Sequence, residues 1–368
     1  MRAAVLTAVG QPLEIRHDVE VEAPRAGEVR IRYAASGVCH TDLSAQNGTL
    51  ILNTPVVLGH EGAGVIEEVG PGVDHLAVGD HVVVSWVPQC GRCWFCQRGE
   101  AHLCENATAA LVTGGLLDGS PRFRSRGAPL YQMLAAGTFA ETSVVPAVAA
   151  VRIPHDVPLE LACLLGCAVL TGVGAALHTA GIGPGASVAV LGCGGVGLNI
   201  VQGARIGGAA DIIAVDLQPD KLALAADLGA TDTVDARACD PVGRVRELTG
   251  ERGVDVAFEA VGTPAAIDQA LAMARRGGRA VLVGIPRMDT VVEIPAFLGL
   301  VMAAKTVTGC WYGSSNASRD IARLVELFRS EALHLAPLVS RTVGLDDVND
   351  ALAAMAAGEV ARTVILYE

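Results

Sequence analysis

Residues 187–197 read Ser-Val-Ala-Val-Leu-Gly-Cys-Gly-Gly-Val-Gly, and this stretch decides the fold of the middle of the chain. Its first five residues are typical of a buried strand. The glycines that follow form a G-x-G-x-x-G pattern before a helix that is expected to reach about Ile206. Such glycines let backbone amides approach a pyrophosphate, whose charge is stabilised at the helix N-terminus. The stretch therefore predicts a dinucleotide site that contains Gly192, Gly194, Gly195, Val196 and Gly197.

The next apolar run predicts a second strand that ends at Asp216, 19 residues after Gly197. A carboxylate at this place accepts hydrogen bonds from the adenosine ribose hydroxyls and repels a 2′-phosphate, which favours NAD over NADP. No arginine follows to bind a 2′-phosphate, because the next residues are Leu217 and Gln218. The alternative is a glycine turn that only packs a helix on a strand, but strand, helix and acid together favour NAD.

After residue 170 strands alternate with helices, which is typical of right-handed βαβ units and a parallel sheet. Further strands are expected at 254–258 and 279–283, and a helix at 219–228. From about residue 312 the alternation fades. Two helices, at 318–330 and near 348–357, then lead to a final strand at 363–367.

Before residue 170, short β-rich runs at 28–33, 63–69 and 80–85 alternate with turns. This pattern predicts a mostly antiparallel, barrel-like domain. Residues 107–137 are rich in glycine and are expected to be loop-like. The basic run 122–126 within them is expected to be a solvated surface.

The composition excludes several classes of protein. Of the 368 residues 51% are hydrophobic, which suits two domains with sizeable cores. The net charge of −12 makes nucleic acid and anionic membranes poor partners. Residues 161–204 contain no charged side chain, but glycines interrupt them, so a buried helix, a turn and a strand are expected instead of a membrane span. The start of the chain lacks a secretory signal, and the expected location is the cytoplasm.

Four of the ten cysteines lie close together in a C-x2-C-x2-C-x7-C pattern. Four thiolates satisfy tetrahedral zinc and leave no open position, so this site is expected to be structural. An iron–sulfur cluster also suits four thiolates, and a cysteine-rich module that binds nucleic acid is a further alternative that the acidic charge argues against. The predicted structural zinc ligands are Cys90, Cys93, Cys96 and Cys104.

Three other segments carry candidate ligands: residues 37–42 (Gly-Val-Cys-His-Thr-Asp), residues 59–62 (Gly-His-Glu-Gly) and residues 166–167 (Gly-Cys). Together with the cysteine cluster and the glycine-rich turn, they make the chain resemble the zinc-dependent medium-chain alcohol dehydrogenases over essentially its whole length. The resemblance implies an α/β protein with a GroES-like catalytic domain at 1–168 and 312–368. A Rossmann coenzyme domain with a doubly wound parallel sheet would occupy 169–311.

The resemblance also implies roles for individual residues. Two thiolates and one imidazole would hold a catalytic zinc and leave its fourth position open; these ligands are Cys39, His60 and Cys167. Asp42 would hold the second ring nitrogen of His60, and Glu61 would lie close to the metal. Thr41 would take the proton of the alcohol. Ser44 stands where many relatives end the proton relay with a histidine, so the last step of the relay stays open.

Further implied residues concern NAD and the substrate. His40 and Arg362 would contact the pyrophosphate, Lys221 would support the adenosine ribose, and Val261, Val283 and Ile285 would line the cofactor site. An apolar substrate pocket would be formed by Leu50, Trp86, Met133, Leu134, Ile285 and Trp311.

We therefore expect an NAD-dependent zinc alcohol dehydrogenase with two zinc ions, acting on primary alcohols of medium length or of allylic or aromatic kind. A homodimer through the coenzyme domains is expected. One alternative is a nicotinoprotein that keeps NAD tightly bound. Another is a thiol-adduct formaldehyde dehydrogenase, although Leu50 and Thr108 stand where that branch carries its charged residues. A non-enzymatic zinc-binding scaffold is the alternative from another class. The zinc-free reductases of the superfamily would lack the three zinc ligands.

Overall fold

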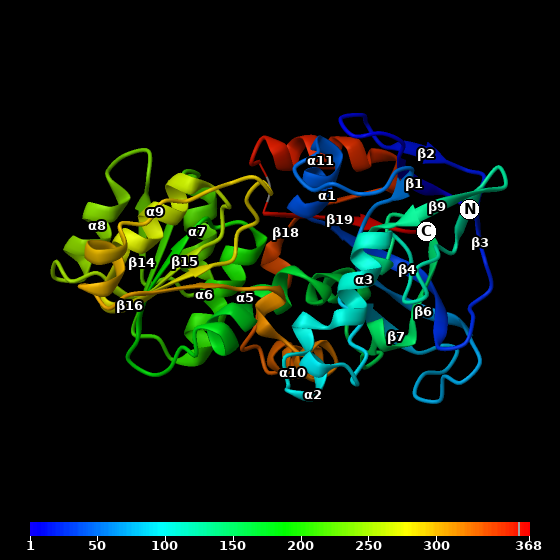
Figure 1. Cartoon of the computed structure of the whole chain (residues 1–368), viewed down its shortest axis with the longest axis horizontal. Coiled ribbons are helices and arrows are strands. Elements are labelled where there is room, and N and C mark those ends of the chain that lie inside the picture. The colour runs from blue at the N-terminus through cyan, green and yellow to red at the C-terminus, as the bar shows by residue number, and fades with distance from the viewer. Residues whose placement is uncertain (360) are drawn as a thin grey trace. The chain divides into compact units, whose positions relative to one another are not determined.

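The computed structural model describes residues 1–359 and 361–368, which form two compact units. Unit 1 comprises Met1–Cys167 and Asn316–Glu368, and unit 2 comprises Ala168–Ser315 (Figure 1). The domain boundaries expected from the sequence, at 168/169 and 311/312, lie one and four residues from these divisions. One unit is β-rich and the other carries a parallel sheet between helices, so the predicted α/β class is confirmed.

Unit 2 is built on a six-stranded sheet whose strands all run parallel, in the order β14-β13-β12-β15-β16-β17. The strand order reverses between β12 and β15, and in such sheets ligands bind at the carboxyl ends of the strands at this point. β14 and β17 were not foreseen from the sequence. The strands are β12 Ser187–Leu191, β13 Asp211–Asp216, β14 Asp232–Asp235, β15 Val254–Glu259, β16 Ala274–Leu282 and β17 Thr306–Gly309.

The helices of unit 2 connect these strands and bury apolar residues against the sheet. α6 packs on β12 and β13, α8 on β14, and α9 on β15 and β16. The first helix of the unit also packs closely on α6, because Gly172 has no side chain. A Cβ atom there would lie 2.5 Å from Cβ of Asn199. The helices are α5 Ala168–Gly174, α6 Gly195–Gly207, α7 Pro219–Asp227, α8 Pro241–Leu248 and α9 Pro264–Met273.

The apolar stretch 161–204 forms short helices followed by β12 and most of α6, as a buried helix, turn and strand would. Within the described residues no single helix has the length and apolar character to cross a membrane. One bent pair, Leu159–Gly166 with Ala168–Thr179, meets both criteria when its two members are counted together.

Unit 1 contains two sheets. A seven-stranded sheet runs β11-β7-β6-β4-β19-β18, with β10 beside β4, and a six-stranded sheet runs β2-β1-β5-β9-β8-β3. Among the strands that the structure describes in unit 1, only the pairs β5–β9 and β18–β19 are parallel, so the predicted mostly antiparallel domain is confirmed. The strands are β1 Ala3–Leu6, β2 Glu14–Arg16, β3 Val19–Val21, β4 Glu28–Val38, β5 Val56–Val57, β6 Glu61–Val69, β7 His81–Val84, β8 Phe123–Ser125, β9 Ala128–Gln132, β10 Thr142–Pro146, β11 Ala150–Arg152, β18 Val339–Val343 and β19 Arg362–Leu366.

β4 is the centre of this unit, because it pairs with β6, β10 and β19. Alternate residues of β4, including Val29, Ile31 and Tyr33, point into a core shared with β6 and β7. The pairing of β19 with β4 joins the end of the chain to its beginning. The helices of unit 1 are α1 His40–Asn47, α2 Trp94–Gln97, α3 Glu105–Thr113, α4 Leu159–Ala162, α10 Ala317–Arg329 and α11 Val348–Ala356.

The expectation of a loop over residues 107–137 was wrong. α3 forms there because Ala107 and Ala110 lie on one buried helix face, and two short strands follow. The expectation that the basic run is solvated was wrong for Arg122, which is 1% exposed. The Arg122 guanidinium forms ion pairs with Glu28, which is distant in sequence, and with Asp118, which is four residues earlier in the loop, so its charge is compensated.

Candidate active site

The first candidate metal site is built where β4 ends and α1 begins. Cys39 is the residue before α1 and has an extended backbone. Asp42 closes the turn, because its Oδ2 accepts a 2.9 Å hydrogen bond from the backbone N–H of Cys39. Its other oxygen, Oδ1, lies 3.2 Å from Nδ1 of His60 and accepts from the backbone N–H of Gly59. Asp42 thereby fixes two candidate ligands from different elements.

Four buried donors converge in unit 1. The ligand atoms of Cys39, His60, Glu61 and Cys167 all lie within 4.8 Å of one another. Tetrahedral zinc with Zn–S bonds of about 2.3 Å separates its ligand atoms by roughly 3.8 Å, so this spacing suits one ion. Glu61 Oε2 is buried and has no hydrogen-bond partner among residues 1–359 and 361–368, which also suits a cation at this place. The donor set fits zinc with two thiolates and one imidazole, as the sequence predicts.

The side chains of the cluster shift one another's pKa values. Burial alone would lower the pKa of His60, but the charges of Asp42 and Cys39 outweigh it and raise that pKa. A hydrogen bond between the two thiols lowers the pKa of Cys39 and raises the pKa of Cys167. Because thiol ligands bind metal as thiolates, one thiolate is favoured before any ion arrives.

Glu61 is linked to Arg362 across the strand between them. Its Oε1 accepts a 2.9 Å hydrogen bond from Nη2 of Arg362, and both side chains are buried. Glu61 on β6 pairs with Gly37 on β4, where a Cβ atom would collide with the Glu61 carboxylate. Burial raises the pKa of Glu61 to about 7, and Arg362 opposes this rise. Arg362, predicted to contact a pyrophosphate, here binds Glu61 and the carbonyl of Val38.

The residues predicted for proton transfer lie on the same helix. Thr41 is half-buried, and its Oγ1 accepts a 3.5 Å hydrogen bond from the thiol of Cys39. Ser44 is buried one turn further along α1. His40 is exposed at the first position of the helix, so its imidazole is accessible. The structure thus brings Thr41 to the metal cluster.

The four-cysteine lobe forms the second candidate metal site, also in unit 1. The four sulfur atoms lie within 4.8 Å of one another. Backbone N–H groups of Cys90 and Cys93 donate to Cys104 and Cys90 at 3.4 Å each. Backbone hydrogen bonds, from Cys96 above all, lower the pKa of Cys93 to about 6. Oriented N–H groups around clustered sulfurs fit a closed four-thiolate zinc site.

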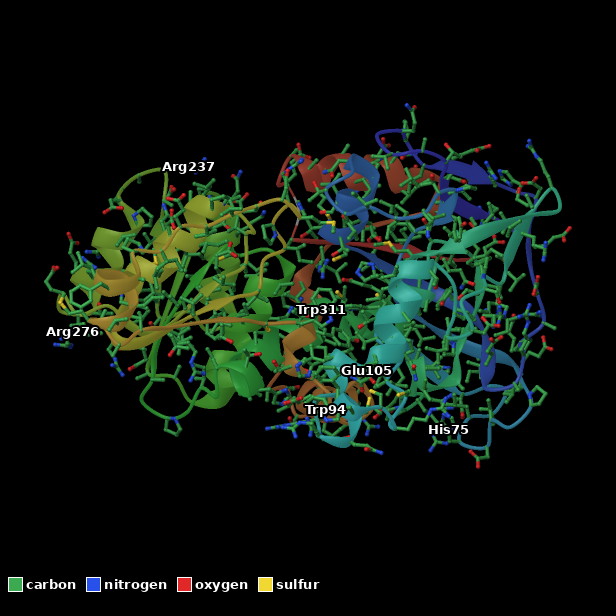
Figure 2. The ribbon with its side chains drawn as sticks, in the orientation of Figure 1. His75, Trp94, Glu105, Arg237, Arg276 and Trp311 are labelled. Carbon is green, nitrogen blue, oxygen red and sulfur yellow. The ribbon has the colours of Figure 1, made fainter. Side chains whose placement is uncertain are left out.

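Short helices frame this lobe. α2 starts at Trp94, directly after Cys93, and α3 starts at Glu105, directly after Cys104 (Figure 2). Trp94 is exposed and stacks beneath the guanidinium of Arg98, whose carbon lies 4.5 Å from the ring centre.

The candidate cofactor site lies at the carboxyl edge of the sheet in unit 2. Gly192 has a φ of +90°, a conformation that suits glycine, and it turns the chain from β12 into α6. A Cβ atom at Gly197 would collide with the carbonyl of Gly192, so this glycine allows close packing of helix on strand. A Cβ atom at Gly194 would meet nothing within 4 Å, and the helix N-terminus is open there. The turn fits a pyrophosphate.

Asp216 ends β13 beside this turn. Its Oδ2 accepts a 2.6 Å hydrogen bond from the backbone N–H of Cys193, and Oδ1 accepts from the backbone N–H of Gln218. The carboxylate is therefore held at the edge where a ribose would lie. Lys221, on α7, is near enough to lower the pKa of Cys193, although burial and Asp216 raise that pKa more strongly.

Three predicted cofactor residues follow β15 and β16 at the same edge. Val261 and Ile285 are about half exposed, and Val283 is buried. A Cβ atom at Gly192 would lie 2.7 Å from Cγ2 of Val261, so the loop after β15 adjoins the glycine-rich turn.

The predicted substrate residues are divided between the units. Unit 1 holds Leu50, which is half-buried, and the buried Trp86, Met133 and Leu134. Leu134 has a φ of 53°, an uncommon backbone conformation for a side-chain-bearing residue. Unit 2 holds Ile285 and Trp311, whose side chains are partly exposed.

Sequence reasoning missed two residues that shape these sites. Gly37 provides the space in which Glu61 reaches Arg362, and its signal was a glycine at the end of an otherwise regular strand. Glu259 is fully buried at the end of β15. The feature of the sequence that could have indicated Glu259 is an acidic residue directly after the apolar residues at the end of a strand.

Comparisons with known proteins agree with this geometry. A family model described as an alcohol dehydrogenase GroES-like domain matches residues 25–155, and one described as a zinc-binding dehydrogenase matches residues 195–330. The chain is 39% identical to an NDMA-dependent alcohol dehydrogenase of Amycolatopsis methanolica, covering 100% of this chain and 98% of the relative. It is 40% identical to an S-(hydroxymethyl)glutathione dehydrogenase of a Synechocystis strain, covering 100% and 99%.

Solved structures give the same result. The crystal structure of benzyl alcohol dehydrogenase from Acinetobacter calcoaceticus matches with a TM-score of 0.94 and 32% identity, covering 100% of this chain and 99% of that chain. The predicted combination of a GroES-like domain with a Rossmann domain is confirmed by these matches.

Proposed function

Because this chain belongs to the zinc-dependent medium-chain alcohol dehydrogenases and is an oxidoreductase of that family, we propose that it interconverts primary alcohols and aldehydes with NAD+ and NADH. The observation that carries the proposal is the buried cluster of two thiols and one imidazole in unit 1. The carboxylate of Asp216 at the sheet edge of unit 2 supports NAD as the cofactor.

The chain's residues divide the chemistry between them. Cys39, His60 and Cys167 would hold zinc, which supplies the Lewis acidity that makes an alcohol hydroxyl lose its proton near neutral pH. Thr41, whose Oγ1 lies beside the Cys39 thiol, accepts that proton and passes it on. NAD, which the glycine-rich turn and Asp216 of unit 2 would hold, would supply the acceptor for the hydride, so one alcohol and one NAD+ would yield one aldehyde, one NADH and one proton. Asp42 keeps His60 in a single orientation throughout.

The apolar character of the residues proposed to contact substrate supports alcohols of medium length or of allylic or aromatic kind. Trp86, Met133 and Leu134 are buried apolar side chains of unit 1, and they offer no charge to a polar substrate. The similarity to a benzyl alcohol dehydrogenase supports an aromatic substrate.

Two alternatives concern cofactor exchange and the substrate. A nicotinoprotein that keeps NAD bound and needs a second oxidant is favoured by the 39% identity to an enzyme named NDMA-dependent. A thiol-adduct substrate is favoured by the identity to S-(hydroxymethyl)glutathione dehydrogenases. The uncharged Leu50 and Thr108 argue against the thiol adduct, and the Thr108 hydroxyl donates instead to the carbonyl of Cys104.

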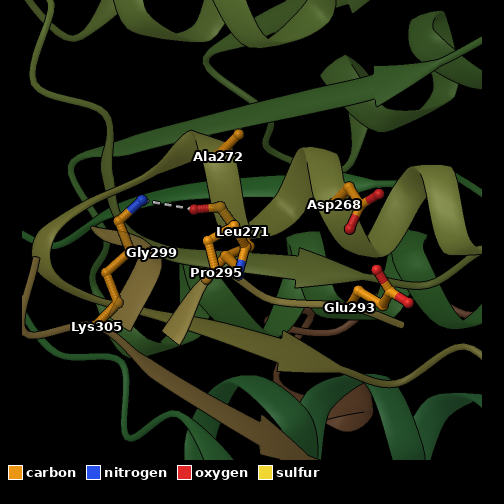
Figure 3. A pocket seen from close by; sticks show the side chains of 7 residues that line it. All are labelled: Asp268, Leu271, Ala272, Glu293, Pro295, Gly299 and Lys305. Atoms are coloured by element: carbon orange, nitrogen blue, oxygen red, sulfur yellow. Dashed lines mark hydrogen bonds between the residues drawn. The ribbon is translucent and has the colours of Figure 1, made fainter. Parts of the chain in front are cut away.

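A homodimer through the coenzyme unit is part of the proposal. β17 is an edge strand, and the segment before it exposes several large apolar side chains, which favours an interface there. A pocket of about 360 Å³ lies between α9 and this segment, with Lys305 bonded to the carbonyl of Leu271 on one side and Asp268 and Glu293 on the other (Figure 3). The exposed residues are Met288, Val291, Phe297, Leu298, Val301 and Met302.

A reducing compartment such as the cytoplasm is also proposed, because all ten cysteines are free thiols and six of the eight candidate metal donors are cysteines, which bind metal only in the reduced state.

The decisive experiment is a steady-state screen of primary, secondary, allylic and aromatic alcohols with added NAD+, added NADP+ or added NDMA. Turnover of primary or benzylic alcohols with NAD+ is expected. Turnover with NDMA alone, together with NAD released by denaturing the purified protein, would establish the nicotinoprotein instead. Activity only with formaldehyde and glutathione would replace the proposed substrate, and inactivity in every arm with zinc-loaded protein would overturn the proposal.

A further inference from the structure

Glu259 is a buried carboxylate at the carboxyl end of β15. The residue is fully buried, yet its Oε1 accepts hydrogen bonds from two backbone N–H groups of the loop that follows the strand. The donors are Val261, at 2.7 Å, and Gly262, at 2.6 Å. The side chain therefore folds back over the loop that follows its own strand. Its two hydrogen bonds fix the backbone at residues 261 and 262.

The same residue also holds the neighbouring loop. Its backbone carbonyl accepts hydrogen bonds from the N–H groups of Val283 and Gly284, at 2.8 and 2.9 Å, where β16 ends. A Cβ atom at Gly284 would lie 2.7 Å from Glu259 Oε2, so only glycine allows the loop to approach the carboxylate. Gly262 has a φ of +86°, and a Cβ atom there would lie 2.6 Å from the carbonyl oxygen of Ile285. Both loops are thus packed around one side chain.

Burying the Glu259 carboxylate destabilises the fold, which indicates that the residue has a role other than stability. Burial raises the pKa of Glu259, and backbone N–H groups, those of Gly262 and Val261 foremost, oppose the rise. Glu259 Oε2 has no hydrogen-bond partner among the described residues. A buried carboxylate without a paired cation destabilises a fold, whereas an apolar residue at the same strand end carries no charge to desolvate.

We propose that Glu259 is a positioning residue that holds the loops after β15 and β16 in the arrangement that receives the nicotinamide half of the dinucleotide. The inference rests on the proposed NAD-dependent function. The sheet order reverses between β12 and β15, and Asp216 lies on the β13 side of this point. The adenosine half belongs on that side, so the loops after β15 and β16 face the other half. Val261 and Ile285 lie in those loops.

The test compares two ligands on the zinc-loaded protein. Glu259→Gln keeps the size of the side chain and one acceptor oxygen for Val261 and Gly262, but it removes the charge of the acceptor. We expect the Kd of NADH, measured by fluorescence, to rise about tenfold, because a hydrogen bond to a charged group has that weight. The Kd of AMP, which contains only the adenosine half, should stay unchanged. Hydrogen exchange should accelerate at residues 261–262 and 283–285 and not at β12.

Asp255 provides a matched control on the same strand. It lies near the opposite end of β15, where it accepts hydrogen bonds from Ser187 and pairs with Arg275. Asp255→Asn should lower the thermal stability of unit 2 and leave the Kd values of NADH and AMP unchanged. If Glu259→Gln behaves like Asp255→Asn, or if the affinities for NADH and AMP fall together, Glu259 only supports the fold and the proposal is wrong.

A second variant guards against a folding failure. Glu259→Asp keeps the charge but shortens the side chain by one methylene, and it should weaken NADH binding less than Glu259→Gln does. A greater loss with aspartate would contradict a role for the carboxylate charge. If the wild-type protein bound AMP but not NADH or NADPH, the proposed function itself would fail. If the wild-type protein binds NADH and both variants bind it equally well, only the role of Glu259 fails.

Discussion

Replacing Arg362 by methionine tests whether the ion pair behind the metal cluster stabilises unit 1. The Arg362 and Glu61 side chains are 4% and 0% exposed, so water cannot compensate for the loss of either partner. The substitution removes the 2.9 Å bond to Glu61 and the 3.0 Å bond to the carbonyl of Val38. Removing one partner of a buried pair costs about 3–5 kcal/mol.

The cost should be local, so the assay must resolve the two units. Equilibrium unfolding of a chain with two units is not a two-state process, whereas native-state hydrogen exchange reports on single segments. For Arg362→Met we expect exchange in β4 and β6 to accelerate by about a hundredfold or more, since each 1.4 kcal/mol is roughly a factor of ten. Exchange in β12 should not change. Zinc content is measured in each variant so that metal loss is not mistaken for loss of the pair.

A double substitution distinguishes the loss of the Glu61–Arg362 ion pair from the loss of side-chain packing. Glu61→Met combined with Arg362→Met removes both charges and keeps most of the volume, so it should be more stable than either single variant. The reasoning is refuted if Arg362→Met changes exchange in β4 and β6 less than about tenfold. It is refuted equally if the double variant is as unstable as the sum of the single variants.

The remaining predictions concern metal, cofactor and substrate. Metal analysis should find two zinc ions per chain. Cys104→Ser should lower the stability of the protein, because metal binding at a structural site is coupled to folding. Cys167→Ser should abolish activity with far less unfolding. If the two variants behaved alike, the division into a structural and a catalytic metal site would be contradicted. The wild type should prefer NAD+ over NADP+ by about a hundredfold in kcat/KM, since the like charges of Asp216 and a 2′-phosphate in a partly buried site cost several kcal/mol. Asp216→Gly should lower kcat/KM with NAD+ and raise it with NADP+. Equal wild-type efficiency with both cofactors would refute the role of Asp216 in choosing NAD. Trp86→Ala should extend the range of alcohols toward bulkier ones, and unchanged relative kcat/KM values across an alcohol series would show that Trp86 does not contact substrate.

The sequence was sufficient to predict structural elements and candidate site residues that depend on neighbours in the chain. The glycine-rich turn, Asp216 at the end of β13 and the cysteine spacing depend on neighbours in the chain, and the structure has β12 and the end of β13 where the pattern predicts them. The strand at 363–367 was expected within one residue of β19. Short segments with few apolar residues, such as β14 and β17, gave no signal, because their pairing is decided by the neighbouring strands of the sheet.

Partners that are distant in sequence were beyond prediction. Arg122 belongs to a basic run that is typical of a surface, and only the fold brings Glu28 to it. Arg362 and Glu61 are separated in the same way, and nothing local to either residue indicates that they bind each other. Glu259 was missed because a single acid in an apolar run is usually a strand end facing solvent. Its burial depends on how closely the next loop packs, which glycine at 284 permits.

The insertion of unit 2 into unit 1 has a consequence for the order of events during synthesis on the ribosome. Residues 168–315 emerge as one continuous segment, so the coenzyme unit can fold as soon as it has left the tunnel. Folding of unit 1 is complete only later, because β4 can pair with β19 only after β19 has been synthesised. Until then residues 35–38 of β4 lack their β19 partner, although β10 already pairs with residues 28–32, and an unpaired stretch of edge is open to association with other chains. The nascent protein is thus open to aggregation until β19 is made, and chaperone binding before that point would protect the unit that carries the candidate metal sites.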